Sequence, residues 1–386
     1  MESGHATALA RPGLLQRRVE ALLARADVRV DGSRPWDLQV RHPRLFARVT
    51  AQGSLGLGEA YMDGDWEAHS LDGLLTRLLE ARLDRQAGGV ALRFDALRAR
   101  LQNLQTRRRS REVGHRHYDL GEDLYAAMLG PEMIYSCGYW RPPSGPPAAD
   151  LAEAQGAKLE LVFRKLGLRA GQRVLDIGCG WGGALRRAAE GHGVRGVGVT
   201  ISAHQAEHAR RACAGLPVDI RLQDYRDLHE PFDRAWSIGM FEHVGVDNYR
   251  TYFETARRCL ADDGLFVLHT IGRNRSVRHT DPWIARYIFP NSMLPSPAQV
   301  ARAVEGLFVI EDWHNFGADY DLTLQAWRDN IEAAWPTLPE RYDRRFRRMW
   351  RYYLAASMAI FRCRRAQLWQ LVLSPHGVPG GYRAPR

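Results

Sequence analysis

Apolar residues recur at helical spacing in three parts of the N-terminal quarter of the chain. The pattern covers residues 15–22, residues 71–79 after the potential capping residue Ser70, and residues 97–104, so each part predicts a helix. Between the first two, the stretch "LFARVTAQGSLGLGEAYMDGDW" (45–66) carries glycines that suggest short strands joined by turns. This part of the chain is therefore expected to be mainly helical.

From about residue 151 the pattern changes to helical segments that alternate with short apolar stretches. The predicted strands are residues 173–177, 194–199, 218–222, 233–238 and 264–271. Alternation of this kind is typical of a parallel, doubly wound sheet with helices on both faces. The end of the chain, residues 323–371, is expected to be helical and very basic.

Two segments without such periodicity divide the chain. The basic connector "QTRRRSREVGHRH" (105–117) marks a domain boundary, and "RPPSGPPAAD" (141–150) reads as a Pro/Gly loop. With 386 residues and 45% hydrophobic composition, the chain is long enough for two cores. We predict an α/β protein with a small, mainly helical domain over residues 1–105 and a doubly wound, Rossmann-like domain over residues 106–386.

The composition of the chain indicates what kind of partner it binds. The formal net charge is +10, and the excess is almost all arginine, because Lys158 and Lys165 are the only lysines. A positive balance suits an anionic partner, either phospholipid headgroups or nucleic acid. The segment "RYDRRFRRMWRYY" (341–353) interleaves arginines with aromatic residues, and Arg107, Arg108, Arg109 and Arg111 form a second basic cluster. Each cluster is a candidate membrane-docking surface, or else a solvated face that packs on the core through its stems.

Cysteine usage and hydropathy point to a compartment. The five cysteines form no CxxC pair and no metal-ligand spacing, so we expect no metal and a reduced, cytoplasmic location. No apolar run approaches the roughly 20 residues of a membrane span, and arginines interrupt any signal-peptide core at the N-terminus. We therefore expect a protein that visits the inner face of the cytoplasmic membrane peripherally.

The candidate chemistry begins with "VLDIGCGWGG" (174–183), in which Asp176 ends a predicted strand. Gly178, Gly180 and Gly182 follow on alternate positions, and glycine lets a backbone approach a ligand closely and adopt positive φ. A dinucleotide loop would need two residues before its third glycine and an acid after the next strand, which instead ends at Thr200. The absence of G-K-[ST] excludes a P-loop.

The D-x-G-x-G-x-G form resembles motif I of the class I S-adenosylmethionine-dependent methyltransferases. Longer stretches resemble the cyclopropane-fatty-acyl-phospholipid synthase family: residues 53–66, 117–140, 198–202 with Gln205, 223–228, 237–245, 268–272, 316–327 and 367–374. The mycolic acid cyclopropane synthases share the catalytic part but generally lack the N-terminal unit. The chain departs from these relatives at Ser357, where a cysteine is common, and at Asp65, where a relative can carry an aromatic residue.

This resemblance implies a cofactor site and a reaction. The residues implied to bind S-adenosylmethionine are Tyr135, Ser136, Asp176, Gly178, Gly180, Gly182, Thr200, Gln205, Asp224, Tyr225 and Arg226. The implied reaction transfers a methylene to the cis double bond of an unsaturated phospholipid acyl chain. The alkene attacks the sulfonium methyl, and a bound bicarbonate then deprotonates the resulting carbocation. The N-terminal unit is implied to contact lipid and is a candidate contact for a homodimer.

The resemblance also implies a cradle for the bicarbonate. Its members are Cys137, Glu242, His269, Tyr320 and the backbone of Ile271. Histidine, tyrosine and a backbone N–H can donate to the anion, whereas a glutamate can accept its O–H. Each side chain also has a structural interpretation. Cys137 can be a buried small thiol and Glu242 a helix N-terminal acid, while His269 can be a hydrogen-bonded core residue and Tyr320 a turn residue. We assign no nucleophilic role to Cys137, because the alkene is itself the nucleophile.

Three other functions stay open at this point. One is transfer of a methyl branch to the acyl chain without ring closure, which the product mass would distinguish only in part, because just the reduced branch carries two extra hydrogens. A nucleic-acid methyltransferase is disfavoured, since "SIGMFEHVG" (237–245) is no N-P-P-[YF] motif and no cysteine arrangement suits cytosine chemistry. A basic membrane-binding protein without catalysis would leave the glycine loop unexplained.

Overall fold

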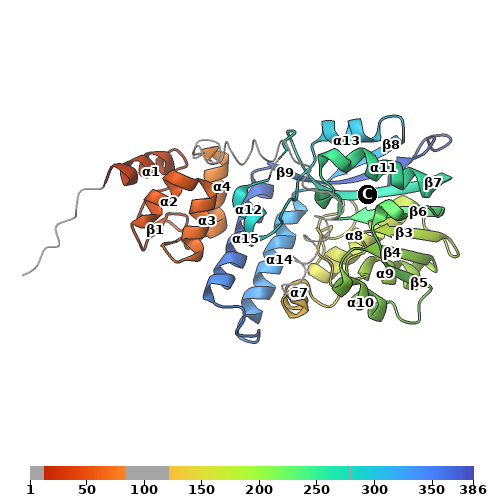
Figure 1. Cartoon of the computed structure of the whole chain (residues 1–386), viewed down its shortest axis with the longest axis horizontal. Coiled ribbons are helices and arrows are strands. Elements are labelled where there is room, and N and C mark those ends of the chain that lie inside the picture. Colours follow the sequence, from red (N-terminus) through yellow and green to blue (C-terminus); the bar gives the residue numbers. More distant parts are fainter. Residues whose placement is uncertain (1–12, 84–120, 279) are drawn as a thin grey trace, which may run out of the picture.

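The computed structural model describes residues 13–83, 121–278 and 280–386. Figure 1 shows the N-terminal helices at one end of the molecule, the helices α14 and α15 in the middle, and a large sheet at the other end. The predicted helix over 97–104, the connector 105–117 and the expected domain boundary near residue 105 lie outside the described residues. Within the described ranges, no helix is both long and apolar enough to span a bilayer.

The N-terminal unit is helical, as predicted, but its centre differs from the prediction. Its elements are α1 (Leu14–Ala24), β1 (Gln39–Val40), α2 (Arg44–Gln52), α3 (Ser54–Met62), β2 (Trp66–Glu67) and α4 (Leu71–Glu80). The Ser70 side chain accepts a hydrogen bond from Gly73 N and caps α4, which confirms the predicted start of that helix. The strands expected over residues 45–66 are wrong, because α2 and α3 occupy most of that stretch.

The physical reason for this error is that two glycines of α3 serve close packing instead of turns. A Cβ on Gly56 would lie 2.3 Å from the carbonyl oxygen of Arg48, and one on Gly58 would lie 2.4 Å from the Trp283 ring. Both glycines are therefore needed where α3 presses against α2 and against the larger domain.

The larger domain is built on a seven-stranded sheet with the order β5-β4-β3-β6-β7-β9-β8. The strands are β3 (Arg173–Ile177), β4 (Arg195–Thr200), β5 (Val218–Leu222), β6 (Phe232–Ile238), β7 (Leu260–Arg273), β8 (Val309–Asn315) and β9 (Ala366–Ser374). β3 to β7 run parallel, while β9 pairs antiparallel with β7 and β8. The five predicted strands are confirmed, and the helical prediction is wrong for residues 366–371.

Helices cover both faces of this sheet, as a doubly wound fold requires. α8 (Leu151–Leu166), α9 (Gly183–His192) and α10 (Ala203–Ala212) share one apolar cluster, and α11 (Tyr249–Arg258) and α13 (Pro297–Val304) share another. The remaining α-helices within the described residues are α7 (Glu122–Leu129), α12 (Pro282–Tyr287), α14 (Asp319–Ala334) and α15 (Arg344–Arg362). A third cluster joins α14 and α15 to the N-terminal unit, so the two predicted domains share a buried interface.

Candidate functional site

The glycine loop follows β3 and has the backbone that only glycine adopts readily. Gly178, Gly180 and Gly182 have φ values of 86°, 52° and 85°. Gly178 N donates to Val199 O at the end of β4, so the loop is held across the carboxyl ends of two strands. Gly182 precedes the first turn of α9, whose unpaired N–H groups favour a polar ligand. The predicted strand–loop–helix unit is therefore present.

A cavity opens beside this loop at the carboxyl ends of β3, β4, β5 and β6, where open α/β sheets bind ligands. All predicted cofactor-binding residues except Gly182 line it: Tyr135, Ser136, Asp176, Gly178, Gly180, Thr200, Gln205, Asp224, Tyr225 and Arg226. Gly182 lies next to the lining residue Gly183. Residues from the distant positions 135–136 and 224–226 thus meet at one cavity.

Polar contacts join several of the predicted residues that line the cavity. Thr200 Oγ1 donates to Gln205 Oε1 over 3.0 Å, which ties the end of β4 to α10. Arg226 donates to both carboxylate oxygens of Asp224, at 2.9 and 2.6 Å. The Arg226 ion pair therefore fixes the orientation of the acid that we expect near an adenine ring.

Two buried ionisable groups line the cavity. Lys158 on α8 is fully buried, and its Nζ donates to Ser136 Oγ over 2.8 Å. Burial lowers the pKa of Lys158 to about 7 and raises the pKa of Asp176 to about 7. This part of the cavity can therefore change its charge near neutral pH.

The acid of the predicted cradle is held by the backbone of β7. Glu242 follows β6 in a short 3-10 turn, Phe241–His243, and its Oε1 accepts from Ile271 N over 2.7 Å. We expected this N–H to donate to the anion, but the structure places it on the glutamate. Burial raises the pKa of Glu242 to about 7, and its Oε2 is buried with no hydrogen-bond partner among the described residues.

His269 lies on β7 opposite Ile238 of β6, with its side chain fully buried. Burial, with Lys158 and Lys165 nearby, keeps the pKa of His269 well below its ordinary value, so the ring is neutral. Its Nε2 is buried, and no described residue bonds to it. Glu242 and His269 thus each carry one buried polar atom that lacks a partner.

Cys137 packs against the helix that carries Tyr320. The Cys137 thiol is fully buried beside Thr323 of α14, with Sγ 3.8 Å from Thr323 Oγ1, and Tyr320 lies one turn earlier on that helix. The Tyr320 ring contacts the Phe361 ring at a centroid distance of 4.5 Å. Burial raises the pKa of Cys137 well above its ordinary value, so this thiol stays protonated.

The cradle residues do not themselves line the cofactor cavity, but two of them directly adjoin lining residues along the chain. Ser136 and His243, the neighbours of Cys137 and Glu242, both line it. The Phe316 ring, just before α14, lies 5.9 Å from the His269 ring by centroids. The structure therefore links Glu242 to Ile271 by a hydrogen bond, Cys137 to the Tyr320 helix through Thr323, and His269 to that helix through Phe316.

A sequence profile of the mycolic acid cyclopropane synthetase family matches residues 105–371. The chain belongs to this family. It is 51% identical to the cyclopropane-fatty-acyl-phospholipid synthase of Escherichia coli (strain K12) over 374 residues, which are 96% of each chain. It is also 34% identical to a probable fatty acid methyltransferase of Mycobacterium tuberculosis, over 86% of this chain and 85% of that one.

The crystal structure of mycolic acid cyclopropane synthase CmaA1, complexed with SAH and CTAB, superposes with a TM-score of 0.59. That match has 31% identity and covers 68% of this chain and 97% of the other. Membership in the cyclopropane synthetase family confirms the predicted Rossmann-like methyltransferase fold and a methyltransferase that uses S-adenosylmethionine. The E. coli relative matches beyond the family profile, into the N-terminal unit.

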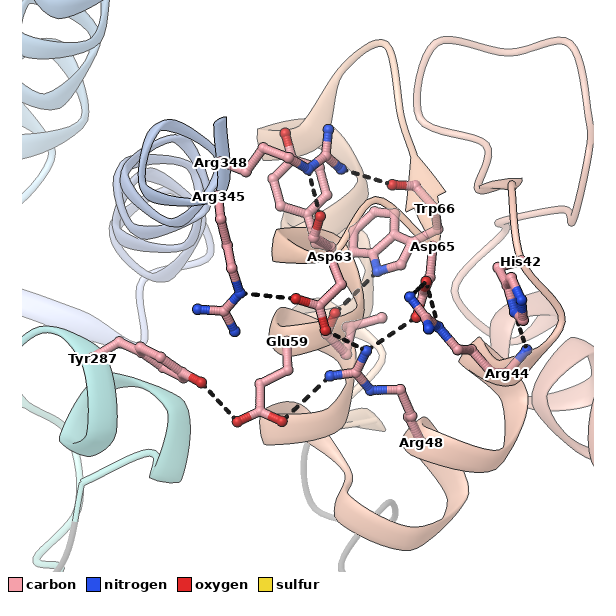
Figure 2. Close-up of polar contacts among 12 residues, drawn as sticks. His42, Arg44, Arg48, Glu59, Asp63, Asp65, Trp66, Tyr287, Arg345 and Arg348 are labelled. Atoms are coloured by element: carbon pink, nitrogen blue, oxygen red, sulfur yellow. Dashed lines mark hydrogen bonds and ion pairs between the residues drawn. The ribbon is translucent and has the colours of Figure 1, made fainter. Parts of the chain in front are cut away.

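The basic segment 341–353 is a candidate docking surface, but two of its arginines make contacts within the protein. Arg348 of α15 is buried and donates to the carbonyl oxygens of Tyr61 and Trp66 in the N-terminal unit. Figure 2 shows Arg345 of the same helix donating to Asp63, over 2.9 Å. These contacts support the structural interpretation of this segment. The second basic cluster, residues 107–111, lies outside the described residues.

Asp65, where we expected a departure from related sequences, has an internal role. It is buried, and its carboxylate accepts from Arg44 over 2.7 Å and from Arg48 over 3.0 Å (Figure 2). The N-terminal unit therefore uses this acid to hold its own helices together.

Lys158 lines the cavity but belongs to none of the motifs that predicted the site. Its signal was present, because only two lysines occur among 54 Lys and Arg residues, and both are buried on α8. In a chain that uses arginine at nearly every basic position, a lysine indicates a site where an ammonium group serves better than a guanidinium.

Proposed function

We propose that this chain transfers a methylene group from S-adenosylmethionine to the cis double bond of unsaturated phospholipid acyl chains. The observation that carries the proposal is the 51% identity to a cyclopropane-fatty-acyl-phospholipid synthase over 96% of the chain. The cavity supports it independently, since residues chosen from motifs alone line one pocket at the carboxyl ends of the strands.

S-adenosylmethionine fits the cavity on two features of this chain. The positive-φ glycines allow close backbone approach, and the aromatic rings of Tyr135 and Tyr225 line the walls. An aromatic face attracts a sulfonium by a cation–π contribution of about 0.5–2 kcal/mol. The Gly178–Gly182 loop and Gln205 would hold the methionyl and ribose parts, and Asp224 with Tyr225 and Arg226 would hold the adenine.

A bicarbonate ion fits the cradle because two buried polar atoms there lack partners. When bound, the ion supplies a base that removes a proton from the methyl group newly attached to the acyl chain. A neutral His269 can donate from Nε2, and Glu242 Oε2 can accept the O–H of the ion. Ile271 N–H orients Glu242, and Tyr320 and the protonated Cys137 close the site.

We also propose that the chain acts at a membrane surface. The net charge of +10 favours anionic lipid, and Leu14 and Leu15 of α1 expose apolar side chains at the end of the molecule far from the sheet (Figure 1). All five cysteines are free thiols, as suits a cytoplasmic protein at the inner face of the membrane. A homodimer would present two such ends to one membrane.

The test supplies purified full-length protein with vesicles of unsaturated phospholipid and methyl-labelled S-adenosylmethionine, with and without bicarbonate. We expect label in a saturated acyl chain that has gained one methylene, activity that falls when carbonate is removed, and protein that sediments with anionic vesicles. Label found only in nucleic acid would reject the proposal.

Methyl branching is the second candidate function, because the chain is 34% identical to a probable fatty acid methyltransferase. A saturated methyl branch carries two more hydrogens than a cyclopropane, and an unsaturated branch keeps a double bond. Mass spectrometry of the acyl product, before and after catalytic hydrogenation under mild conditions, separates these outcomes. Without a reductant the branched chain keeps its double bond, so a product that becomes two mass units heavier after hydrogenation would favour branching.

A further inference from the structure

The cradle histidine belongs to a row of polar side chains that crosses three adjacent strands. In the antiparallel ladder, Gln370 of β9 is the register partner of His269 on β7 and of His314 on β8. Register partners on neighbouring strands point to the same face of a sheet. Gln370 is fully buried and interrupts the apolar β9, although an unpaired buried amide is costly.

The hydrogen bond inside this row has a direction. Gln370 Nε2 lies 3.3 Å from His269 Nδ1. In this arrangement the amide nitrogen faces the ring and can only donate, so Nδ1 is the acceptor and carries no proton. Because the buried ring is neutral, its single proton is then on Nε2. The amide oxygen Oε1 is buried with no partner among the described residues, so the reversed amide, which would accept from a protonated Nδ1, is the alternative that the NMR experiment below decides.

The Nε2–H tautomer is the one that an anion site requires. The Nε2 atom is buried and, among the described residues, has no partner, and the same holds for Glu242 Oε2. An Nε2–H group donates to an anion, whereas the other tautomer would direct a lone pair at it. Partners on the far ring nitrogen set the tautomer of functional histidines in the same way elsewhere.

We propose that Gln370 is a positioning residue that holds His269 as the Nε2–H tautomer and so makes it a hydrogen-bond donor to the anion in the cradle. The second half of this statement rests on the proposed function; the tautomer itself does not.

The tautomer can be read directly by nitrogen NMR of the full-length protein labelled with ¹⁵N-histidine. The His269 signals among the 14 histidines are assigned by their loss in His269→Asn. We expect a protonated Nε2 and a bare Nδ1 in the wild type. In Gln370→Glu the new carboxylate accepts a hydrogen bond from the ring, so Nδ1 should become protonated. Gln370→Met removes the amide donor at similar side-chain volume, so both tautomers should appear in this variant. A protonated Nδ1 in the wild type, or unchanged signals in both variants, would overturn the proposal.

Kinetics test the consequence for the anion. In carbonate-depleted buffer with added bicarbonate, Gln370→Glu should raise the KM for bicarbonate at least tenfold, and Gln370→Met several-fold. The Kd for S-adenosylmethionine, measured by calorimetry, should stay within twofold of the wild type, which also shows that each variant is folded. A bicarbonate KM unchanged in both variants would contradict the anion role.

The matched control is Gln367→Met on the same strand. Gln367 is also buried, but its amide bonds to Asn315 and to the carbonyl oxygen of Arg364. We expect this variant to leave the His269 signals and the bicarbonate KM unchanged. If the wild type needs no bicarbonate, the proposed base is wrong, while the NMR result still decides the role of Gln370.

Discussion

Glu242 is almost completely buried, and its environment favours the protonated form. Burial raises its pKa from 4.5 to about 7, while Ile271 N–H holds one of its oxygens. The folded protein therefore binds this proton more tightly than the unfolded chain does. Ionisation of Glu242 consequently destabilises the fold as pH rises from its ordinary pKa through about 7.

Replacement Glu242→Gln should remove that pH dependence, because an amide does not ionise. We expect the urea midpoint of the variant to fall less than that of the wild type between about pH 5 and pH 8. Methylene transfer should drop on the order of a hundredfold, since the variant cannot accept the O–H of a bound anion in the same way. Identical pH slopes in the two proteins would show that Glu242 is already ionised at pH 5.

A second prediction for a single residue is that Cys137 behaves as an inert thiol. Its complete burial keeps the pKa of the thiol high, and the reactive species of cysteine is the thiolate. Iodoacetamide at pH 8 should therefore modify the half-buried Cys363 long before Cys137, as followed by peptide mass spectrometry. Alkylation in urea is the control, where both thiols should react alike; rapid modification of native Cys137 would disprove this assignment.

At the scale of elements, the loop between β3 and α9 depends on glycine at specific positions. Gly178 has φ +86°, and a Cβ there would lie 2.6 Å from Met240 Cγ. Gly191, near the end of α9, has nothing within 4 Å of such a Cβ. The two positions therefore make a matched pair.

Gly178→Ala should strain the loop by about 1–3 kcal/mol and weaken S-adenosylmethionine binding about tenfold or more in calorimetry. Gly191→Ala should leave binding unchanged and raise the free energy of unfolding by about 0.5–1 kcal/mol, because it lies in a helix. Equal affinities in the two variants would show that the Gly178 loop does not approach the ligand.

The strands of the sheet differ in how well the sequence predicts them. The five parallel strands and the lining of the cavity could be predicted, because apolar stretches and motif glycines report local structure. The two added strands could not. β9 is buried on both faces and shows no alternation, and β8 exposes Val309 and Ile310, so neither has the period of two that identifies a strand.

The geometry of the cradle lay beyond prediction for a related reason. The bonds from Ile271 N–H to Glu242 and from Gln370 to His269 depend on the register between strands. Because β9 is buried on both faces, its apolar pattern does not distinguish one register from another.

At the scale of the whole molecule, the N-terminal unit is fastened to the larger domain by a few arginines. Arg348 is buried between the two, where it donates to Tyr61 O, Trp66 O and Glu67. Tyr287 of α12 donates to Glu59 over 2.8 Å on the neighbouring side of the interface (Figure 2). Buried polar contacts and a shared apolar cluster therefore join the two units.

Arg348→Met should destabilise the protein by about 3 kcal/mol, because it leaves three acceptors in the interface without their donor. Arg345→Gln is the control: its ion pair with Asp63 is half exposed, so the loss should be about 0–1 kcal/mol. Urea unfolding followed by tryptophan fluorescence measures both. Equal losses would show that the buried arginine contributes no more than its exposed neighbour.

The burial of both lysines has a practical consequence for anyone who handles this protein. Amine-directed reagents such as succinimidyl esters meet no accessible ε-amino group on the folded chain, so conjugation should be confined to the α-amino terminus. An endoproteinase that cuts only after lysine would likewise find its sites, at positions 158 and 165, only when α8 opens. Its cleavage rate would then report transient unfolding of the catalytic half without any label.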